Sequence, residues 1–159
     1  MGNLCAVGEE KGNWQQEKIE YPEWECIEVN VDSGAIDSVL NTKTGAQFPV
    51  RETAMSRKGA YYEAANGTPI YNHGERDIKG FTDEGTNLDV TFQVADVKGP
   101  LGSVKRFTEA GNLVVFDDKG GAIINKTTGA QTLFSLNEKG IYALKLWVRK
   151  EQNFQGQES

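Results

Sequence analysis

Apolar and polar residues alternate along much of this chain with the two-residue period of a β-strand. The first such segment spans 24–31, where Ile27, Val29 and Val31 alternate with polar residues before the turn at 32–35. The segment 88–97 alternates in the same way. Shorter apolar runs, each bounded by turn residues, predict four more strands, at 113–116, 122–124, 131–136 and 141–148.

Two turns rich in Gly and acidic or amide residues predict β-hairpins. Asn66-Gly67 separates the runs 60–65 and 68–71, and Asn-Gly is the dipeptide most typical of a two-residue hairpin turn. The segment 83–85, Asp-Glu-Gly, separates 75–82 from 88–97 and has the same turn chemistry.

One short helix is predicted at 104–110. Ser103 can cap its first turn, and Gly111 can end it in a left-handed conformation. Turn signals recur about every 8–12 residues elsewhere, as in all-β domains. The pattern therefore predicts a closed, mainly antiparallel all-β fold with one short helix.

Polar ends flank this patterned region. We expect a flexible polar leader at 1–20, one domain at 21–148 and a flexible tail at 149–159. The chain has 159 residues, of which 38% are hydrophobic and 25% charged, which is the composition of a single globular domain.

Charge and residue counts exclude several classes of function. The net charge of -6 argues against nucleic acid or an anionic membrane as a partner, and no run of about 18 apolar residues could span a membrane. Two cysteines, Cys5 and Cys26, and one histidine, His73, are too few for a structural zinc site. We expect no metal, no cofactor and a cytoplasmic location. N-terminal acylation at Gly2 and Cys5 stays open, although Ala6 stands where Ser or Thr is expected.

The candidate chemistry lies in Asp32-Ser33-Gly34, directly after the first strand. A carboxylate on a tight loop that Gly permits is half of an aspartic protease dyad, in which two carboxyl groups share one proton and activate a water molecule. The same tripeptide is also an ordinary turn, so the residues alone leave both interpretations open.

The order of motifs resembles the retropepsin-like aspartic proteases, in particular the copia-type retrotransposon proteases, over about residues 24–136. The similar segments are the strand and loop 29–35, the hairpin 62–71 in the place of the flap, the paired strands that follow, and the apolar-Gly step Leu101-Gly102 that opens the helix. The resemblance implies an acid-protease fold, a retropepsin-like closed barrel or sandwich. The resemblance also implies a catalytic role for Asp32, Ser33 and Gly34. It implies that the substrate is bound by Ala35, Asp37, Ala65, Asn66 and Gly67.

Only one such motif occurs in the chain, so a second carboxylate has to come from another copy. We therefore expect a homodimer with Asp32 and its symmetry mate on the two-fold axis. The leader and 141–148 are the candidates for an intersubunit sheet. The expected activity is that of an aspartic endopeptidase of retroelement origin, with a polypeptide substrate as its partner.

Three alternatives to an active aspartic endopeptidase stay open. The domain could be a catalytically inactive dimerisation or interaction module, or a plain accessory β-domain in which Asp32-Ser33-Gly34 is merely a turn. A nucleophilic pair of His73 with Cys5 or Cys26 is the weakest, because His73 lies between turn residues and neither cysteine belongs to a motif.

Overall fold

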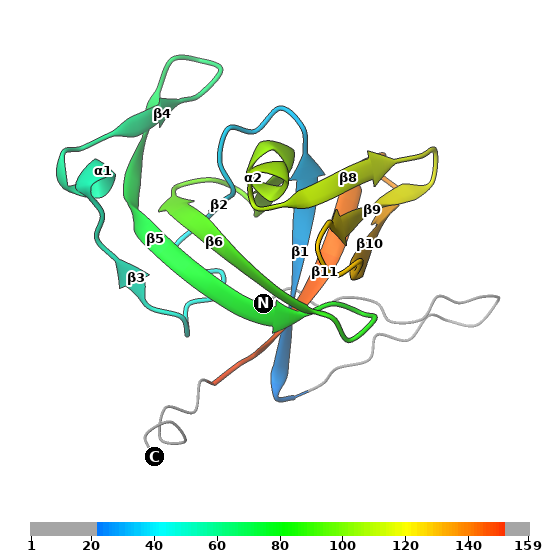
Figure 1. The fold of residues 1–159 in the computed structure, drawn as a ribbon. Helices are drawn as coiled ribbons and strands as arrows, with labels where there is room; N and C mark the ends of the chain where they lie inside the picture. The colour runs from blue at the N-terminus through cyan, green and yellow to red at the C-terminus, as the bar shows by residue number, and fades with distance from the viewer. Residues whose placement is uncertain (1–21, 152–159) are drawn as a thin grey trace.

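The computed structural model describes residues 22–151 of the chain, and most of them belong to strands (Figure 1). The predicted leader, 1–20, and most of the predicted tail lie outside the described residues. In chain order the elements are β1 (Trp24–Asp32), β2 (Val39–Leu40), β3 (Val50–Arg51), α1 (Ala54–Arg57), β4 (Tyr61–Glu63), β5 (Pro69–Phe81), β6 (Asn87–Ala95), β7 (Leu101–Ser103), α2 (Val104–Glu109), β8 (Asn112–Phe116), β9 (Gly120–Asn125), β10 (Gln131–Leu136) and β11 (Tyr142–Arg149).

The strands form one mixed sheet that curls back on itself. Neighbours follow the order β3-β5-β6-β2-β7-β1-β11-β10-β9-β8, and β11 also pairs with β5, where Trp147 lies opposite Phe81. The β1–β7 and β2–β6 pairs are parallel, and the other pairs within residues 22–151 are antiparallel. The mainly antiparallel all-β class is thus confirmed. The ring is joined at β5–β11 by that single residue pair, so it is not a clear barrel.

The core lies inside this ring. Ile27, Val29 and Val31 of β1 point inward and are buried, while Glu28 between them is exposed. Phe92 of β6 and Leu146 of β11 pack in the same cluster and are fully buried. The alternation in the sequence therefore marks the inward face of these strands correctly.

β5 is one strand of 13 residues, where the sequence predicts two strands separated by a turn at 72–74. The strand continues because Gly74 takes a φ of 131° and donates its N–H to the Asn72 Oδ1 at 2.8 Å. The register with β6 shifts between Asn72 and Gly74, as at a β-bulge. What the sequence presents as a turn is therefore a bulge inside a long strand.

There are two short helices in the described part of the chain, not the single one expected. The predicted helix is α2, with Ser103 as its N-cap and Gly111 at a φ of 95° after its end. The helix that the sequence pattern misses is α1. A capping box between Thr53 and Ser56 stabilises it, because each side chain accepts a hydrogen bond from the backbone of the other.

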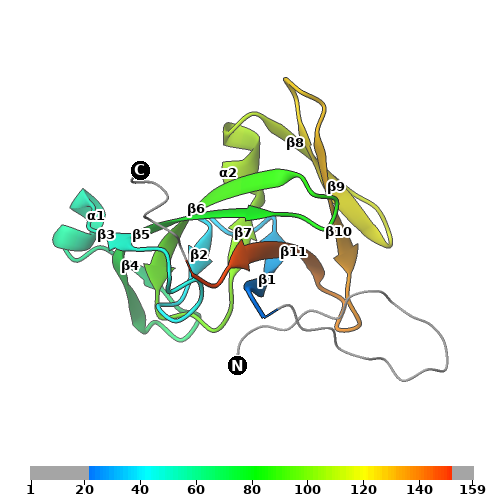
Figure 2. The same cartoon turned by 90° about the horizontal axis from the view of Figure 1, so that it is seen from below.

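β11 is an interior strand within residues 22–151. It pairs with β1 over seven residue pairs and with β10 at its beginning. β1 thus occupies one edge of β11 within this chain, and an intersubunit sheet that includes 141–148 stays a prediction. Figure 2 shows β8, β9 and β10 on one side of the molecule, and α1 and β4 on the opposite side. No helix among the described residues is long and apolar enough to cross a membrane.

Candidate functional site

Asp32 is the last residue of β1, at the point where β1 runs parallel to β7. Asn30, Val31 and Asp32 lie opposite Leu101, Gly102 and Ser103. Gly102 permits this approach, since a Cβ atom there would lie 3.0 Å from Val29 Cγ1 and 3.2 Å from the ring of Phe107. The start of the loop after β1 is thus fixed by the pairing of two strands that lie far apart in the sequence.

The loop after Asp32 is held by short polar contacts. The Gly34 N–H donates to Asp32 Oδ1 at 2.8 Å, which orients the carboxylate and leaves Oδ2 without this bond. The fully buried Ser103 donates its hydroxyl to the carbonyl of Ala35 at 2.8 Å. Its N–H donates to the Ser38 Oγ at 2.9 Å. The side chain of Ser33 is exposed. The hydrogen bonds that hold this loop within the chain are therefore those of Ser103 with Ala35 and Ser38.

The predicted flap is a hairpin formed by β4 and the first part of β5. Tyr61 pairs with Tyr71 and Glu63 with Pro69, and the Gly67 N–H donates to the Ala64 carbonyl at the tip. Gly67 has a φ of 86° but Asn66 does not have a positive φ, so the tip is a turn over 64–67 that ends in a left-handed glycine, not the two-residue turn that is most typical of Asn-Gly. In Figure 1 the tip of this hairpin and the loop after β1 lie at the same end of the molecule.

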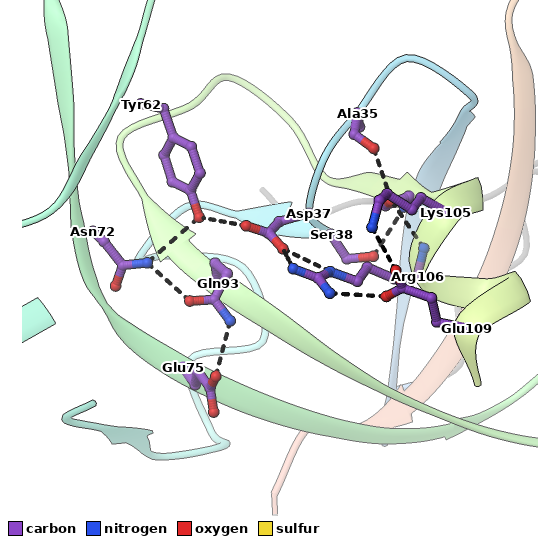
Figure 3. Close-up of polar contacts among 11 residues, drawn as sticks. Ala35, Asp37, Ser38, Tyr62, Asn72, Glu75, Gln93, Lys105, Arg106 and Glu109 are labelled. Carbon is purple, nitrogen blue, oxygen red and sulfur yellow. Dashed lines mark hydrogen bonds and ion pairs between the residues drawn. The ribbon is translucent and has the colours of Figure 1, made fainter. Parts of the chain in front are cut away.

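Asp37 joins the loop after β1 to both the hairpin 61–71 and α2 (Figure 3). The hydroxyl of Tyr62, on β4, donates to Asp37 Oδ2 at 3.2 Å. Arg106, on α2, donates to Asp37 Oδ1 from Nε at 2.7 Å and pairs with it through Nη2 at 2.5 Å. Burial, followed by the negative charge of Asp37, raises the pKa of Tyr62 to about 12. The phenol is therefore a donor at any physiological pH.

A polar network continues from Tyr62 across β5 and β6. The Asn72 Nδ2 donates to Gln93 Oε1 at 2.8 Å and lies 3.4 Å from the Tyr62 hydroxyl. Gln93 Nε2 donates to Glu75 Oε2 at 3.0 Å, and Glu75 also pairs with Arg51 at 2.6 Å. The sequence analysis does not identify these residues as part of a site. Their common signal is the strand register, because Glu75 lies opposite Gln93 in the β5–β6 pair.

A cavity of about 440 Å³ lies beside this network, between α2 and the strand β6. Phe107 and Val90 contribute apolar surface to it, and the carboxylates of Asp37, Glu75 and Asp89 contribute charge. The loop after β1 therefore adjoins a concave surface with both apolar and charged parts.

The residues predicted from the sequence fall into two groups. Asp32, Gly34, Ala35 and Asp37 lie in one loop and are tied to β7 and α2, whereas the flap residues 65–67 are exposed at a hairpin tip. Only Asp37 of the predicted substrate-binding residues lines the cavity, and its carboxylate is already bound by Arg106.

The other candidate chemistry from the sequence finds no support in the described residues. His73 lies on β5, not in a loop, and its Nε2 is 3.5 Å from Asp96 Oδ1. Cys26 is buried in β1 and Cys5 lies outside the described residues. Among residues 22–151 no three His, Cys, Asp or Glu side chains gather as metal ligands would.

Comparison with protein families finds none that matches the chain, and comparison with curated proteins finds none similar to it. The function is therefore inferred from the residues and their geometry.

Proposed function

We propose that this chain is an aspartic endopeptidase that hydrolyses polypeptides as a homodimer. The observation that carries the proposal is the placement of Asp32. Its carboxylate lies at the end of a buried strand, it accepts the Gly34 N–H at 2.8 Å, and Ser103 fixes the loop behind it. These contacts restrict the orientation of the carboxylate, which supports a role in acid–base catalysis.

The second carboxylate of the dyad comes from a second copy of the chain. Asp37 is the nearest aspartate along the chain, but Arg106 and Tyr62 bind its two oxygens. A two-fold axis beside Asp32 would place two such residues together and give each the same environment. The two groups would then share one proton, because like charges at about 3 Å cannot both ionise.

The dyad supplies both halves of the reaction. The ionised carboxylate takes a proton from a water molecule, whose oxygen attacks the scissile carbonyl carbon, while the protonated carboxyl donates a hydrogen bond to the carbonyl oxygen. As the tetrahedral intermediate breaks down, a proton passes from the dyad to the leaving amine. The proposal uses side-chain carboxylates and water, so it names no cofactor.

The flap closes this site in our proposal. An extended polypeptide would lie between the hairpin tip 65–67 and the loop after β1, bound by main-chain hydrogen bonds as an added strand. Closure of the hairpin would exclude water from the reacting carbonyl.

The first test compares the wild type with Asp32→Asn in an unbiased peptide library, with and without a pepstatin-type inhibitor. Asparagine keeps the oxygen that accepts the Gly34 N–H but cannot take the proton from water. We expect cleavage to fall by roughly 10³-fold or more, with folding and dimerisation unchanged.

Asp118→Asn is the matched control. Asp118 is exposed in the turn between β8 and β9, and its substitution removes the same negative charge as Asp32→Asn does. It should cleave like the wild type. Wild-type cleavage by Asp32→Asn, or a wild-type dimer with no peptidase activity from about pH 3 to 7, would overturn the proposal in favour of an interaction module.

A further inference from the structure

The cavity beside the catalytic loop has the features of a pocket for a long side chain. Part of its lining is apolar, since it includes Phe107, which is buried with 6% of its surface exposed, and Ala110. Thr91 and Gln93 of β6 add polar groups at its wall. Such a pocket suits a side chain with an aliphatic stem and a polar end.

The charges around the cavity favour a cation at that polar end. Three carboxylates and one guanidinium line it, and this guanidinium, Arg106, is held between Asp37 and Glu109. Glu75 pairs with Arg51 outside the lining. The lining as a whole therefore carries more negative than positive charge.

Asp89 is the carboxylate that stays available to a ligand. Within residues 22–151 it makes no hydrogen bond or ion pair, although Lys79 lies opposite it on β5. An exposed carboxylate with an apolar surface beside it can pair with an incoming ammonium or guanidinium group. Asp89 lines the cavity together with Val90 and Thr91.

The cavity lies within reach of a peptide bound at Asp32. Asp37 lines it and belongs to the same loop, five residues further along, and five residues span at most about 18 Å even when extended. Tyr62 of the flap hairpin contacts Asp37 as well, so loop, flap and cavity adjoin one another (Figure 3). A side chain a few residues from the scissile bond could enter the cavity.

We propose that this cavity binds a lysine or arginine side chain of the polypeptide, and that Asp89 and Glu75 determine this preference. The proposal rests on the proposed function, because it places the cavity in the substrate cleft. It names the class of substrate as a polypeptide with a basic residue near the cleavage site.

The experiment uses a set of peptides in which one lysine is moved along an otherwise uncharged sequence, and a second set with norleucine in its place. Norleucine keeps the aliphatic stem and lacks the ammonium group. We expect the wild type to cleave lysine peptides more efficiently at one position relative to the scissile bond, with a ratio of kcat/KM of about tenfold.

Variants then assign this preference to the cavity. Asp89→Asn should reduce the ratio severalfold, and Asp89→Lys should shift the preference to a peptide with glutamate at the same position. Glu75→Gln should also reduce it, but it alters the contacts with Arg51 and Gln93, so Asp89 is the cleaner site. Asp118→Asn should leave the ratio unchanged.

Binding of the same labelled peptides to the full-length Asp32→Asn protein, followed by fluorescence anisotropy, separates the two proposals. Cleavage with no preference for lysine, and no effect of Asp89→Lys, would overturn the pocket and leave the peptidase. A second outcome is that lysine peptides bind more tightly than norleucine peptides, that Asp89→Asn abolishes this difference, and that the wild type cleaves neither set. This outcome would support the pocket and overturn the peptidase. Equal binding of both sets without cleavage would overturn both.

Discussion

Tyr62 illustrates how a single side chain depends on the fold around it. It lies on β4, is partly buried, and donates its hydroxyl to Asp37 Oδ2 at 3.2 Å. Both burial and the charge of Asp37 disfavour the phenolate, so the pKa of Tyr62 rises from 10.0 to about 12. The neutral phenol is the form that links the hairpin 61–71 to the loop after β1.

This shift predicts a dependence of stability on pH. The folded protein holds the Tyr62 proton more tightly than the unfolded chain, so the stabilisation is complete below pH 10 and is lost as the pH rises from 10 to about 12. A titration of tyrosinate absorbance should show one group ionising near pH 12 in the wild type. That step should be missing in Tyr62→Phe.

Tyr142→Phe is the control, because its hydroxyl donates to the Asp117 carbonyl and not to a carboxylate. It should retain the step near pH 12. If Tyr62→Phe instead loses a group that ionises near pH 10, the contact with Asp37 does not form in solution.

At the scale of elements, the two hairpins share a turn chemistry but differ in position. Gly67, at the tip of the flap, has a φ of 86°, and Gly85, between β5 and β6, has a φ of 84°. At either residue a Cβ atom would meet nothing within 4 Å. Only the backbone conformation therefore opposes a larger side chain, and it does so equally in both turns.

This pair gives a matched test of the flap. Valine at a positive φ is strained, so Gly67→Val and Gly85→Val should each lower the free energy of unfolding by about 1–2 kcal/mol. If the hairpin 61–71 covers the substrate, only Gly67→Val should also reduce kcat/KM strongly. Chemical denaturation and peptide cleavage measure the two effects separately. Equal activity of the two variants would mean that this hairpin does not act as the flap.

At the scale of the whole molecule, the chain provides one candidate catalytic carboxylate, that of Asp32, and the proposed reaction needs two. Mass action therefore links activity to concentration. We expect the cleavage rate per chain to fall on dilution through the dissociation constant of the dimer, as measured by sedimentation. A fully active monomer would contradict the shared dyad.

Mixing wild type with Asp32→Asn tests the same point without dilution. Random pairing at equal amounts leaves about half of the wild-type chains in mixed dimers, which hold only one ionisable catalytic residue. The rate per wild-type chain should then fall to about one half. An equal amount of Asp118→Asn should cause no such loss.

Much of the fold follows from local signals in the sequence. The alternation of Ile27, Val29 and Val31 identifies β1 and its buried face, and Asn66-Gly67 and Ser103 identify the flap turn and the helix cap. These features were predictable because turn conformation, capping and side-chain period depend on residues that lie close together in the chain.

The contacts that complete the candidate site depend on distant parts of the chain, and only the tertiary structure reveals them. Asp37 contacts Arg106, 69 residues away, and the carbonyl of Ala35 accepts the hydroxyl of Ser103, 68 residues away. Local pattern likewise misses that 72–74 is a bulge and that β11 is an interior strand. The sequence by itself determined the candidate catalytic aspartate, because Asp32-Ser33-Gly34 is a local motif. The packing of β1 against β7 and α2 decided which groups surround it, because strand pairing joins residues whatever their separation in the chain.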